Sequence, residues 1–479
     1  MTGFCLVLSG LESLSREDLL ALLALQQRQI EDLKSTVVAL TDKVRDLESR
    51  LGRNSGNSSM PPSSDIFVKP ERRKKPSSGR PRGKEPGAPG MSLKLVERPD
   101  QQLDEFPPEC GGCRSALPKA SVGFTRRQCH DILPISVQIT ETRWHRVRCG
   151  CGQVTAAKVP DDVPDCPYYG PQLATLAVYL LAYQHVPVER AAKLIRDVTG
   201  AAPSTGWIAS QLVKVAGLVE APNKLIMALL ILASVLHADE TATNVAGKKS
   251  WLHVACTNKL TLLTLAPRSK AGAAAGGVLP NFTGTMVHDA LWLYRGFPDA
   301  DHQLCCAHVI RELTACDERF PGQIWAPQIR WSLAEMIKVA DAARSEGLDH
   351  IPPERLRRWL IYYNSAIQVG LHHHPVNPQS DKQSMETNLL LRLRDYKDQY
   401  LRFTVGLAVP ATNNAAERDL RPVKTQLKIS GCHASATGAK NWLAVRSYIV
   451  TAIKHGLGAF DAIRQAITGQ PWMPSIEFA

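Results

Sequence analysis

The most regular pattern along the chain lies near the N-terminus, where apolar residues recur at alternating intervals of three and four. The apolar stripe consists of Leu23, Ile30, Val37, Val44 and Leu51, interleaved with Leu33, Leu40 and Leu47. This heptad spacing, with one polar residue, Gln26, in the stripe, predicts a coiled coil over residues 1–53 and at least a homodimer. A surface helix packed on its own domain is the alternative.

Residues 54–98 show no apolar periodicity and are rich in Ser, Asn, Pro and Gly, a composition that cannot build a core. We therefore predict a flexible linker. The linker carries a basic cluster that includes Arg72, Arg73, Lys74 and Lys75. These side chains can contact a DNA phosphate backbone without sequence preference, whereas a linker that only adds solubility is the alternative.

The pattern becomes helical over residues 161–224. "VERAAKLIRDV" and "STGWIASQLVKVAGLV" each carry apolar residues at helical spacing, "TGAAP" separates them, and Ser204 is placed to cap the second helix. Two helices joined by a Gly-containing turn predict a helix-turn-helix DNA-binding region that offers Thr205, Gln211 and Lys214 to a groove. An ordinary helical hairpin is the alternative.

Short apolar runs predict strands in residues 225–479. "ILASVLH" reads as a buried strand that ends at Asp239 and Glu240, "SWLHVACT" and "TLLTLAP" as a hairpin, and "GTMVHDA" as a strand that delivers Asp289. A basic, largely helical stretch follows over about residues 321–405, and a later helix carries Glu417. The chain is therefore predicted to be a multidomain mixture of α+β and α/β structure.

The helix that carries Glu417 is also rich in basic residues. At helical spacing Glu417 shares one face with Arg421, Lys424 and Lys428, so a carboxylate lies beside cations that suit phosphates. Pro422 predicts a kink between them. We assign DNA contacts on this helix to Arg418, Arg421, Lys424 and Lys428.

Composition narrows the class of protein. The chain has 479 residues, 44% of them hydrophobic, and its 57 Lys and Arg against 45 Asp and Glu give a net charge of +12. A length of this order predicts several domains, and the positive charge favours polyanionic partners such as DNA. No apolar run is long enough for a bilayer and no secretory segment is evident, so we expect a cytoplasmic protein without membrane contact.

Four cysteines in two pairs occur in residues 99–160: Cys110 and Cys113 in "CGGC", and Cys149 and Cys151 in "RCGC". Four thiolates can close a tetrahedral Zn²⁺ site, and a module this small gains from a structural metal. We therefore predict a zinc-binding module, in which Cys129 or His130 can replace a ligand. Unrelated cysteines are the alternative.

Two strands that end in carboxylates, with a third carboxylate on a later helix, are typical of a ribonuclease H-like nuclease core. Asp239, Asp289 and Glu417 are then the ligands of two Mg²⁺ or Mn²⁺ ions, since carboxylate oxygens suit these hard cations. Glu240 faces away from Asp239, because alternate strand residues point in opposite directions. We interpret His237, His288 and His308 as core or hydrogen-bonded residues rather than metal ligands.

Several motifs in the same order along nearly the whole chain carry a resemblance to a known family. They are "LGRNSGNSSMPPSSD", the paired cysteines, "DET" at 239–241, "CAHVIREL" at 306–313 and "NNAAERDLRP" at 413–422. Together they resemble the transposases of the insertion-sequence-sixty-six family. The resemblance implies a ribonuclease H-like domain with a helical insertion, and it places the three catalytic acids on Asp239, Asp289 and Glu417.

The resemblance also implies a bacterial enzyme that binds the ends of a mobile element and uses metal-dependent hydrolysis and strand transfer to move it. Its partners would be the terminal repeats, target DNA and small accessory proteins. Two alternatives stay open: a ribonuclease H-like nuclease or resolvase that cuts without joining, and an inactive DNA-binding oligomer.

Removal of residues 1–51 is expected to convert the oligomer into monomers, because the heptad stripe is the clearest self-association surface in the sequence. Light scattering measures the mass of the truncated protein. An unchanged oligomeric mass would show that other surfaces hold the subunits together.

Overall fold

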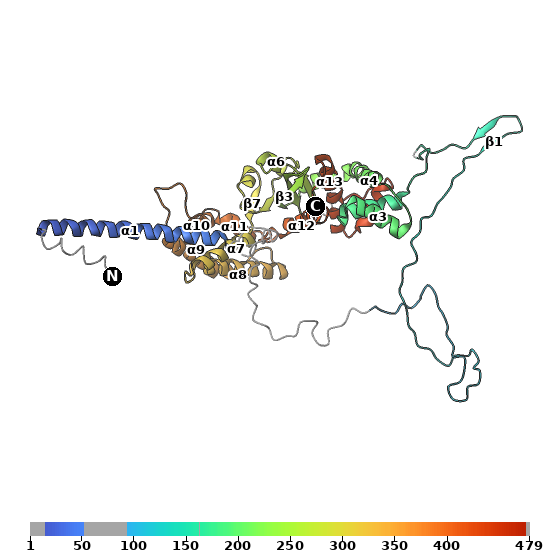
Figure 1. Cartoon of the computed structure of the whole chain (residues 1–479), viewed down its shortest axis with the longest axis horizontal. Helices are drawn as coiled ribbons and strands as arrows, with labels where there is room; N and C mark the ends of the chain where they lie inside the picture. The colour runs from blue at the N-terminus through green and yellow to red at the C-terminus, as the bar shows by residue number, and fades with distance from the viewer. Residues whose placement is uncertain (1–14, 52–92, 162, 476–479) are drawn as a thin grey trace, which may run out of the picture.

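The computed structural model describes residues 15–51, 93–161 and 163–475. Figure 1 shows a central sheet surrounded by helices, with the segment that carries β1 extending away from it. The strands of this five-stranded sheet are β3 (Val235–Val245), β4 (Lys248–Cys256), β5 (Thr261–Leu265), β6 (Thr285–His288) and β7 (Asp301–Leu304). Their order is β5-β4-β3-β6-β7. β4 pairs antiparallel with both β3 and β5, whereas β6 pairs parallel with β3, and β7 pairs parallel with β6. The predicted hairpin is therefore confirmed.

The predicted limits of the strand before Asp239 are wrong at both ends. The helix α5 (Glu220–Ile231) continues through Ile231, and β3 begins only at Val235 and runs six residues past Asp239 to Val245. β3 is long because its hairpin with β4 continues after its parallel pairing with β6 has ended at His237. Asp239 therefore lies in the middle of β3, at the level where the neighbouring strand β6 stops.

Helices cover both faces of the sheet. On one face lie α12 (Asn414–Ser430), α13 (Ala436–Lys454) and α14 (Ala459–Ile467), together with α2 (Pro171–Val178) and α4 (Thr205–Leu218). These helices share a core with the alternating β4 side chains Leu252, Val254 and Cys256. The opposite face carries α5, α6 (Lys270–Ala274) and the short turns η3 (Leu279–Asn281) and η4 (Trp292–Gly296), which pack on Leu236 and Ala238.

The two helices predicted over residues 161–224 are present. α3 (Val188–Thr199) ends at Gly200, whose φ is 77°, and α4 begins after Ser204, whose hydroxyl accepts a hydrogen bond from the Trp207 N–H at 3.1 Å. A π-helical turn, η2 (Tyr179–Tyr183), follows α2. Val215 of α4 is buried with residues of α13, and the predicted boundary at 224 lies inside α5. The proposed role of α4 in a DNA groove stays a prediction.

A second helical body follows β7. It consists of α7 (Cys306–Arg319), α8 (Trp325–Ser345), α9 (Pro353–His373), α10 (Met385–Asp395), α11 (Lys397–Tyr400) and the turn η5 (Arg402–Thr404). These helices enclose their own core around Trp325, Leu333 and Tyr363. The stretch predicted to be helical over about 321–405 is therefore helical, and Figure 1 shows it to the left of and below the sheet.

The predicted N-terminal helix is present as α1 (Arg16–Leu51), which has 36 residues. Its apolar stripe is open to solvent in the single chain: Leu23 is 61% exposed and Leu33 is 64% exposed. Pairing with a second copy stays a prediction. The basic cluster Arg72, Arg73, Lys74 and Lys75 lies outside the described residues. Among the helices that are described, none is long and apolar enough to cross a membrane.

Candidate active site

The sheet register brings Asp239 and Asp289 together. β3 and β6 are parallel neighbours, and the last pair in their register is His237 with Val287. Asp239 lies two residues after His237, and Asp289 lies two residues after Val287. Because adjacent strands are about 4.8 Å apart, the two acids come side by side. Sequence reasoning predicted both residues, and the parallel pairing explains why they meet.

Asp239 and Asp289 are half-buried residues, and the burial of their carboxyl groups changes their acidity. Burial raises the pKa of Asp239 well above its usual range, and the charges of Asp289 and Glu240 raise it further. Burial also raises the pKa of Asp289 to about 6, with a further contribution from Glu240. Each acid accepts one backbone hydrogen bond, from Glu240 N–H at 2.8 Å and from Leu291 N–H at 3.0 Å. Two buried carboxylates side by side therefore need a cation to be ionised at low cost.

Glu417 reaches the same region from α12. It lies in the first turn of this helix, which packs on β3, and its charge also raises the pKa of Asp239. Its Oε1 lies 3.8 Å from His308 Nε2 and 3.7 Å from Arg311 Nη2, both on α7. That oxygen is buried and has no hydrogen-bond partner within the described residues. The predicted helix is confirmed, and it runs without interruption through Pro422 to Ser430.

Asn413 fixes the start of α12 against the sheet. Its side-chain N–H donates to the Ala238 carbonyl at 2.8 Å, and its Oδ1 lies 3.0 Å from His237 Nδ1. Its backbone N–H donates to Cys305 Sγ at 3.1 Å. Asn413 is fully buried, so these contacts are shielded from water. They place Glu417, one helical turn later, beside the strand that carries Asp239.

Glu240 points away from this group, as predicted. Its Oε1 accepts hydrogen bonds from Arg268, at 3.0 Å from Nε, and its Oε2 accepts one from the Tyr294 hydroxyl at 2.7 Å. Tyr294 belongs to the core on the face opposite α12. Glu240 is therefore a buried carboxylate that already has partners, in contrast to Asp239.

Two of the three histidines near the strands, His237 and His288, are buried and hydrogen-bonded, as predicted. His237 contacts Asn413, and His288 Nε2 lies 2.9 Å from His302 Nδ1. Burial lowers the pKa of His288 to about 3, so this ring is neutral. His308 lies beside Glu417, a position that its spacing from the acids in the sequence did not indicate.

Sequence reasoning missed the residues that surround the acids. His308 and Arg311 occur in "CAHVIREL", and Asn413 begins "NNAAERDLRP", so the motifs contained them without indicating their contacts. Arg268 and Tyr294 lie in segments with no recognisable motif. Their relation to Glu240 depends on tertiary packing alone.

The basic residues predicted on α12 are available to a ligand. Arg418, Arg421 and Lys428 are exposed and Lys424 is half-buried. Within the described residues none of the four forms an ion pair. The face therefore presents positive charge beside the acids.

The chemistry of the acids fits a divalent cation, although they do not converge on one position here. Across residues 15–51, 93–161 and 163–475, no three Cys, His, Asp or Glu side chains are placed to share a metal ion. Glu417 instead lies beside His308 and the guanidinium of Arg311 on α7. A divalent cation would relieve the raised pKa values of Asp239 and Asp289 and would give Glu417 Oε1, which accepts no hydrogen bond within the described residues, a ligand to bind.

The four cysteines form two separate local turns. Cys110 and Cys113 lie in a turn closed by the Arg114 N–H to Cys110 carbonyl hydrogen bond of 2.9 Å. Cys149 and Cys151 lie between the short strands β1 (Arg146–Arg148) and β2 (Val154–Ala156). Hydrogen bonds with Ser115 lower the pKa of Cys113 to about 7, and the Cys151 N–H lowers that of Cys149. One cysteine of each pair therefore favours the thiolate form. Within the described residues the two pairs do not come together around one position, so zinc binding stays a prediction.

Comparison with known proteins adds a family assignment to this geometry. Residues 167–441 match the family model described as Transposase IS66 family, and this segment includes Asp239, Asp289 and Glu417. Residues 13–94 match a family of unknown function (DUF6444), a segment that contains α1 and most of the predicted linker. No curated protein matches the chain.

Cys110→Ser or Cys149→Ser is expected to release Zn²⁺ from the purified protein and to loosen residues 100–160, because a four-thiolate site contributes folding energy directly. Metal analysis and limited proteolysis measure the two effects. Stoichiometric zinc in both variants would rule out these ligands, and Cys166→Ser, at an exposed cysteine outside the two pairs, is the control.

Asp289→Asn is expected to stabilise the metal-free protein at pH 7.5. The pKa of Asp289 rises from 3.8 to about 6 on folding, so its ionised form opposes folding above pH 6 and has no effect below pH 3.8. A shift of this size corresponds to about 3 kcal/mol. Thermal unfolding in a chelator should show a higher midpoint at pH 7.5 and a smaller gain near pH 4.5.

The exposed-site variant Asp349→Asn is the matched control for this measurement and should leave the midpoint unchanged. An equal or lower midpoint for Asp289→Asn at pH 7.5 would show that the carboxylate is not strained by its surroundings.

Proposed function

The chain belongs to the Transposase IS66 family, and from this premise we propose that Asp239, Asp289 and Glu417 catalyse DNA strand cleavage and strand transfer. The observation that carries the proposal is a pair of half-buried acids with raised pKa values, Asp239 on β3 and Asp289 directly after the parallel strand β6. Buried groups with strongly shifted pKa values are common at functional sites.

We also propose that the catalytic core is ribonuclease H-like. Three antiparallel strands continued by two parallel strands, with the first acid on the central strand, support this assignment. A later helix that packs on the same strand and carries the third acid supports it too.

The three acids would hold Mg²⁺ or Mn²⁺, most simply as two ions. When bound, such ions stabilise the charge that develops on the phosphate and on its attacking and leaving oxygens. Glu417 has to turn from His308 and Arg311 to join Asp239 and Asp289. Arg311 is then free to balance a phosphate, and the contacts of Asn413 keep α12 in place.

The reaction consists of two displacements at phosphorus. A water molecule attacks a phosphodiester at the element end, the P–O3′ bond breaks, and the products are a 3′ hydroxyl and a 5′ phosphate. The 3′ hydroxyl then attacks a phosphodiester of the target, forms a new P–O bond and releases another 3′ hydroxyl. No protein side chain needs to become covalently attached, and the attacking oxygen loses its proton in each step.

DNA binding is proposed to come from regions outside the acids. The exposed basic side chains of α12, the linker cluster at 72–75 and the α4 residues Thr205, Gln211 and Lys214 would contact DNA. α1 would join two copies through its open apolar stripe, so that two element ends are held together. Accessory transposition proteins are a further proposed partner.

Asp239→Asn, Asp289→Asn and Glu417→Gln should each reduce cleavage and joining by at least ~100-fold, because each removes a charge that acts on the transition state. Binding to DNA should survive, since the phosphate contacts do not pass through these acids. The assay follows labelled element ends with Mg²⁺ or Mn²⁺, with a gel shift as the binding measurement.

Glu240→Gln is the internal control and should cost less than ~10-fold, because Glu240 faces Arg268 and Tyr294 instead. Normal cleavage by all three acid variants would overturn the catalytic assignment. Cleavage without joining by the wild-type protein would identify a nuclease or resolvase, and binding without cleavage would identify an inactive DNA-binding oligomer.

A further inference from the structure

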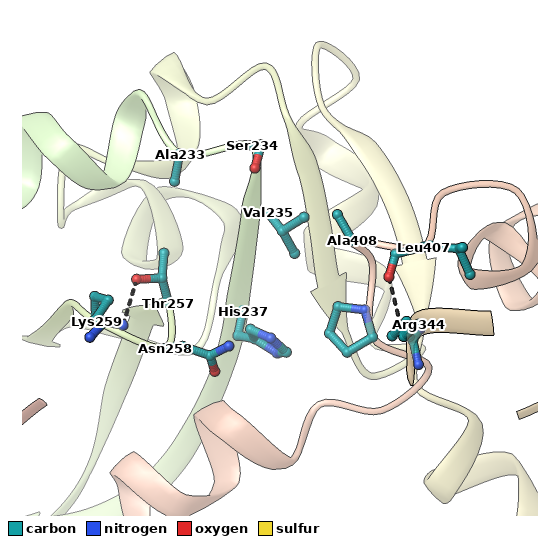
Figure 2. Close-up of a pocket in the computed structure, with 11 residues that line it drawn as sticks. Ala233, Ser234, Val235, His237, Thr257, Asn258, Lys259, Arg344, Leu407 and Ala408 are labelled. Atoms are coloured by element: carbon teal, nitrogen blue, oxygen red, sulfur yellow. Dashed lines mark hydrogen bonds between the residues drawn. The ribbon is translucent and has the colours of Figure 1, made fainter. Parts of the chain in front are cut away.

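Two hollows adjoin at the turn between β4 and β5, and neither is lined by Asp239, Asp289 or Glu417. The first has a volume of about 540 Å³ and lies between the start of β3, this turn and the helical insertion. Figure 2 shows His237 and Asn258 near one another on one wall and Arg344 with Leu407 opposite. The second, of about 260 Å³, lies between the turn, α12 and α13. Both are lined by Thr257 and Asn258, so the two hollows meet at this turn, and together they are named the basic channel here.

The lining of the basic channel is strongly biased towards positive charge. Its basic residues are Lys259, Arg344, Arg418, Arg446 and Lys454, and its one acidic lining residue is Asp419. Asp419 is already engaged, because its Oδ2 accepts hydrogen bonds from Lys454 Nζ and from the Thr261 hydroxyl, both at 2.6 Å. Arg344 is paired with Asp341, just outside the lining. Basic residues still outnumber acidic ones in the lining, so its net charge is positive.

Arg446 is the most informative of these residues, because it is only 6% exposed. Its Nη1 donates to the carbonyls of Ala182 and Tyr183, whereas its Nε is buried and has no hydrogen-bond partner within the described residues. Burial lowers the pKa of Arg446 to about 10, so the Tyr183 ring and the charge of Asp419 offset the cost of burying the guanidinium only in part. An anion bound in the hollow that Arg446 lines would offset this cost.

Arg418 lines the same hollow from α12 and is exposed. It follows Glu417 directly, so successive residues of one helix face the acids and the channel. A polyanion seated in the channel would therefore be held by the same helix that positions the third acid. Residues on both sides of Asn258 would contact it, which suits an extended ligand better than a single small anion.

We propose that the basic channel binds the phosphate backbone of DNA outside the catalytic site. The identity of the ligand as DNA rests on the proposed function, whereas its polyanionic nature follows from the lining. The channel would thus contribute affinity and position for a segment of the substrate that is not being cleaved.

Asn258→Asp tests the channel with almost no change in shape. It adds one negative charge to the wall that both hollows share, at an exposed position. We expect DNA affinity, measured by fluorescence anisotropy in 50 mM salt, to fall about three- to tenfold, and the difference to shrink in high salt. Asn364→Asp, an exposed position on α9, makes the same change of net charge and should bind DNA like the wild type.

Arg418→Gln provides a second variant. The slope of log binding constant against log salt concentration is expected to decrease in size by about 0.9 for duplex DNA and by about 0.7 for a single strand. Separate titrations with duplex, single strand and inorganic phosphate identify the source of the phosphate groups. A loss of affinity for only one of the two DNA forms supports the proposal and identifies the form that binds in the channel. Thermal unfolding verifies that each variant is folded.

DNA affinities equal to wild type for both channel variants would overturn the proposal, as would an equal loss in Asn364→Asp. Inorganic phosphate binding that depends on Asn258, with unchanged DNA affinity, would also overturn it. The result is separate from the proposed function, because binding is measured without divalent ions. Active Asp239→Asn would refute the catalytic assignment and leave the channel measurement valid.

Discussion

The site depends on one buried side chain, the amide of Asn413. It donates to the Ala238 carbonyl, contacts His237, and its backbone N–H bonds to Cys305 at the end of β7. Three segments that are up to 176 residues apart in the sequence therefore meet at one amide. Because α12 begins there, its first turn is held against β3 close to Asp239. A buried amide with all these contacts satisfied stabilises one register of helix on sheet and disfavours others.

Near the start of α12, the carboxylates of the site differ in whether another side chain balances them. The Glu240 carboxylate is buried but has Arg268 and Tyr294 as partners. Within the part of the chain that the structure describes, the carboxylates of the half-buried Asp239 and Asp289 accept hydrogen bonds from backbone N–H groups alone. Such unbalanced burial reduces stability, and proteins retain it where the charge has a use. The pleat of β3 creates the difference, because it turns adjacent carboxylates towards opposite faces.

Much of the fold and the acids themselves could be predicted from local pattern. Heptad spacing predicted α1, turn residues predicted the β4–β5 hairpin, and apolar runs that end in acids identified Asp239 and Asp289. The true extent of β3 could not be predicted, because its second half is polar and is held by pairing with β4. The contacts of Asn413 and Glu417 are equally non-local. They arise from packing between distant segments, and no pattern in the sequence indicates that these segments are in contact.

The central claim is that Asp239, Asp289 and Glu417 bind divalent cations together. Diffraction from crystals grown with Mn²⁺, recorded on both sides of the manganese absorption edge, locates the ions directly. The predicted result is anomalous density in contact with Asp239 and Asp289, with Glu417 turned from Arg311 towards it. Manganese held by other residues, or no density at a concentration that supports DNA cleavage, would contradict the claim.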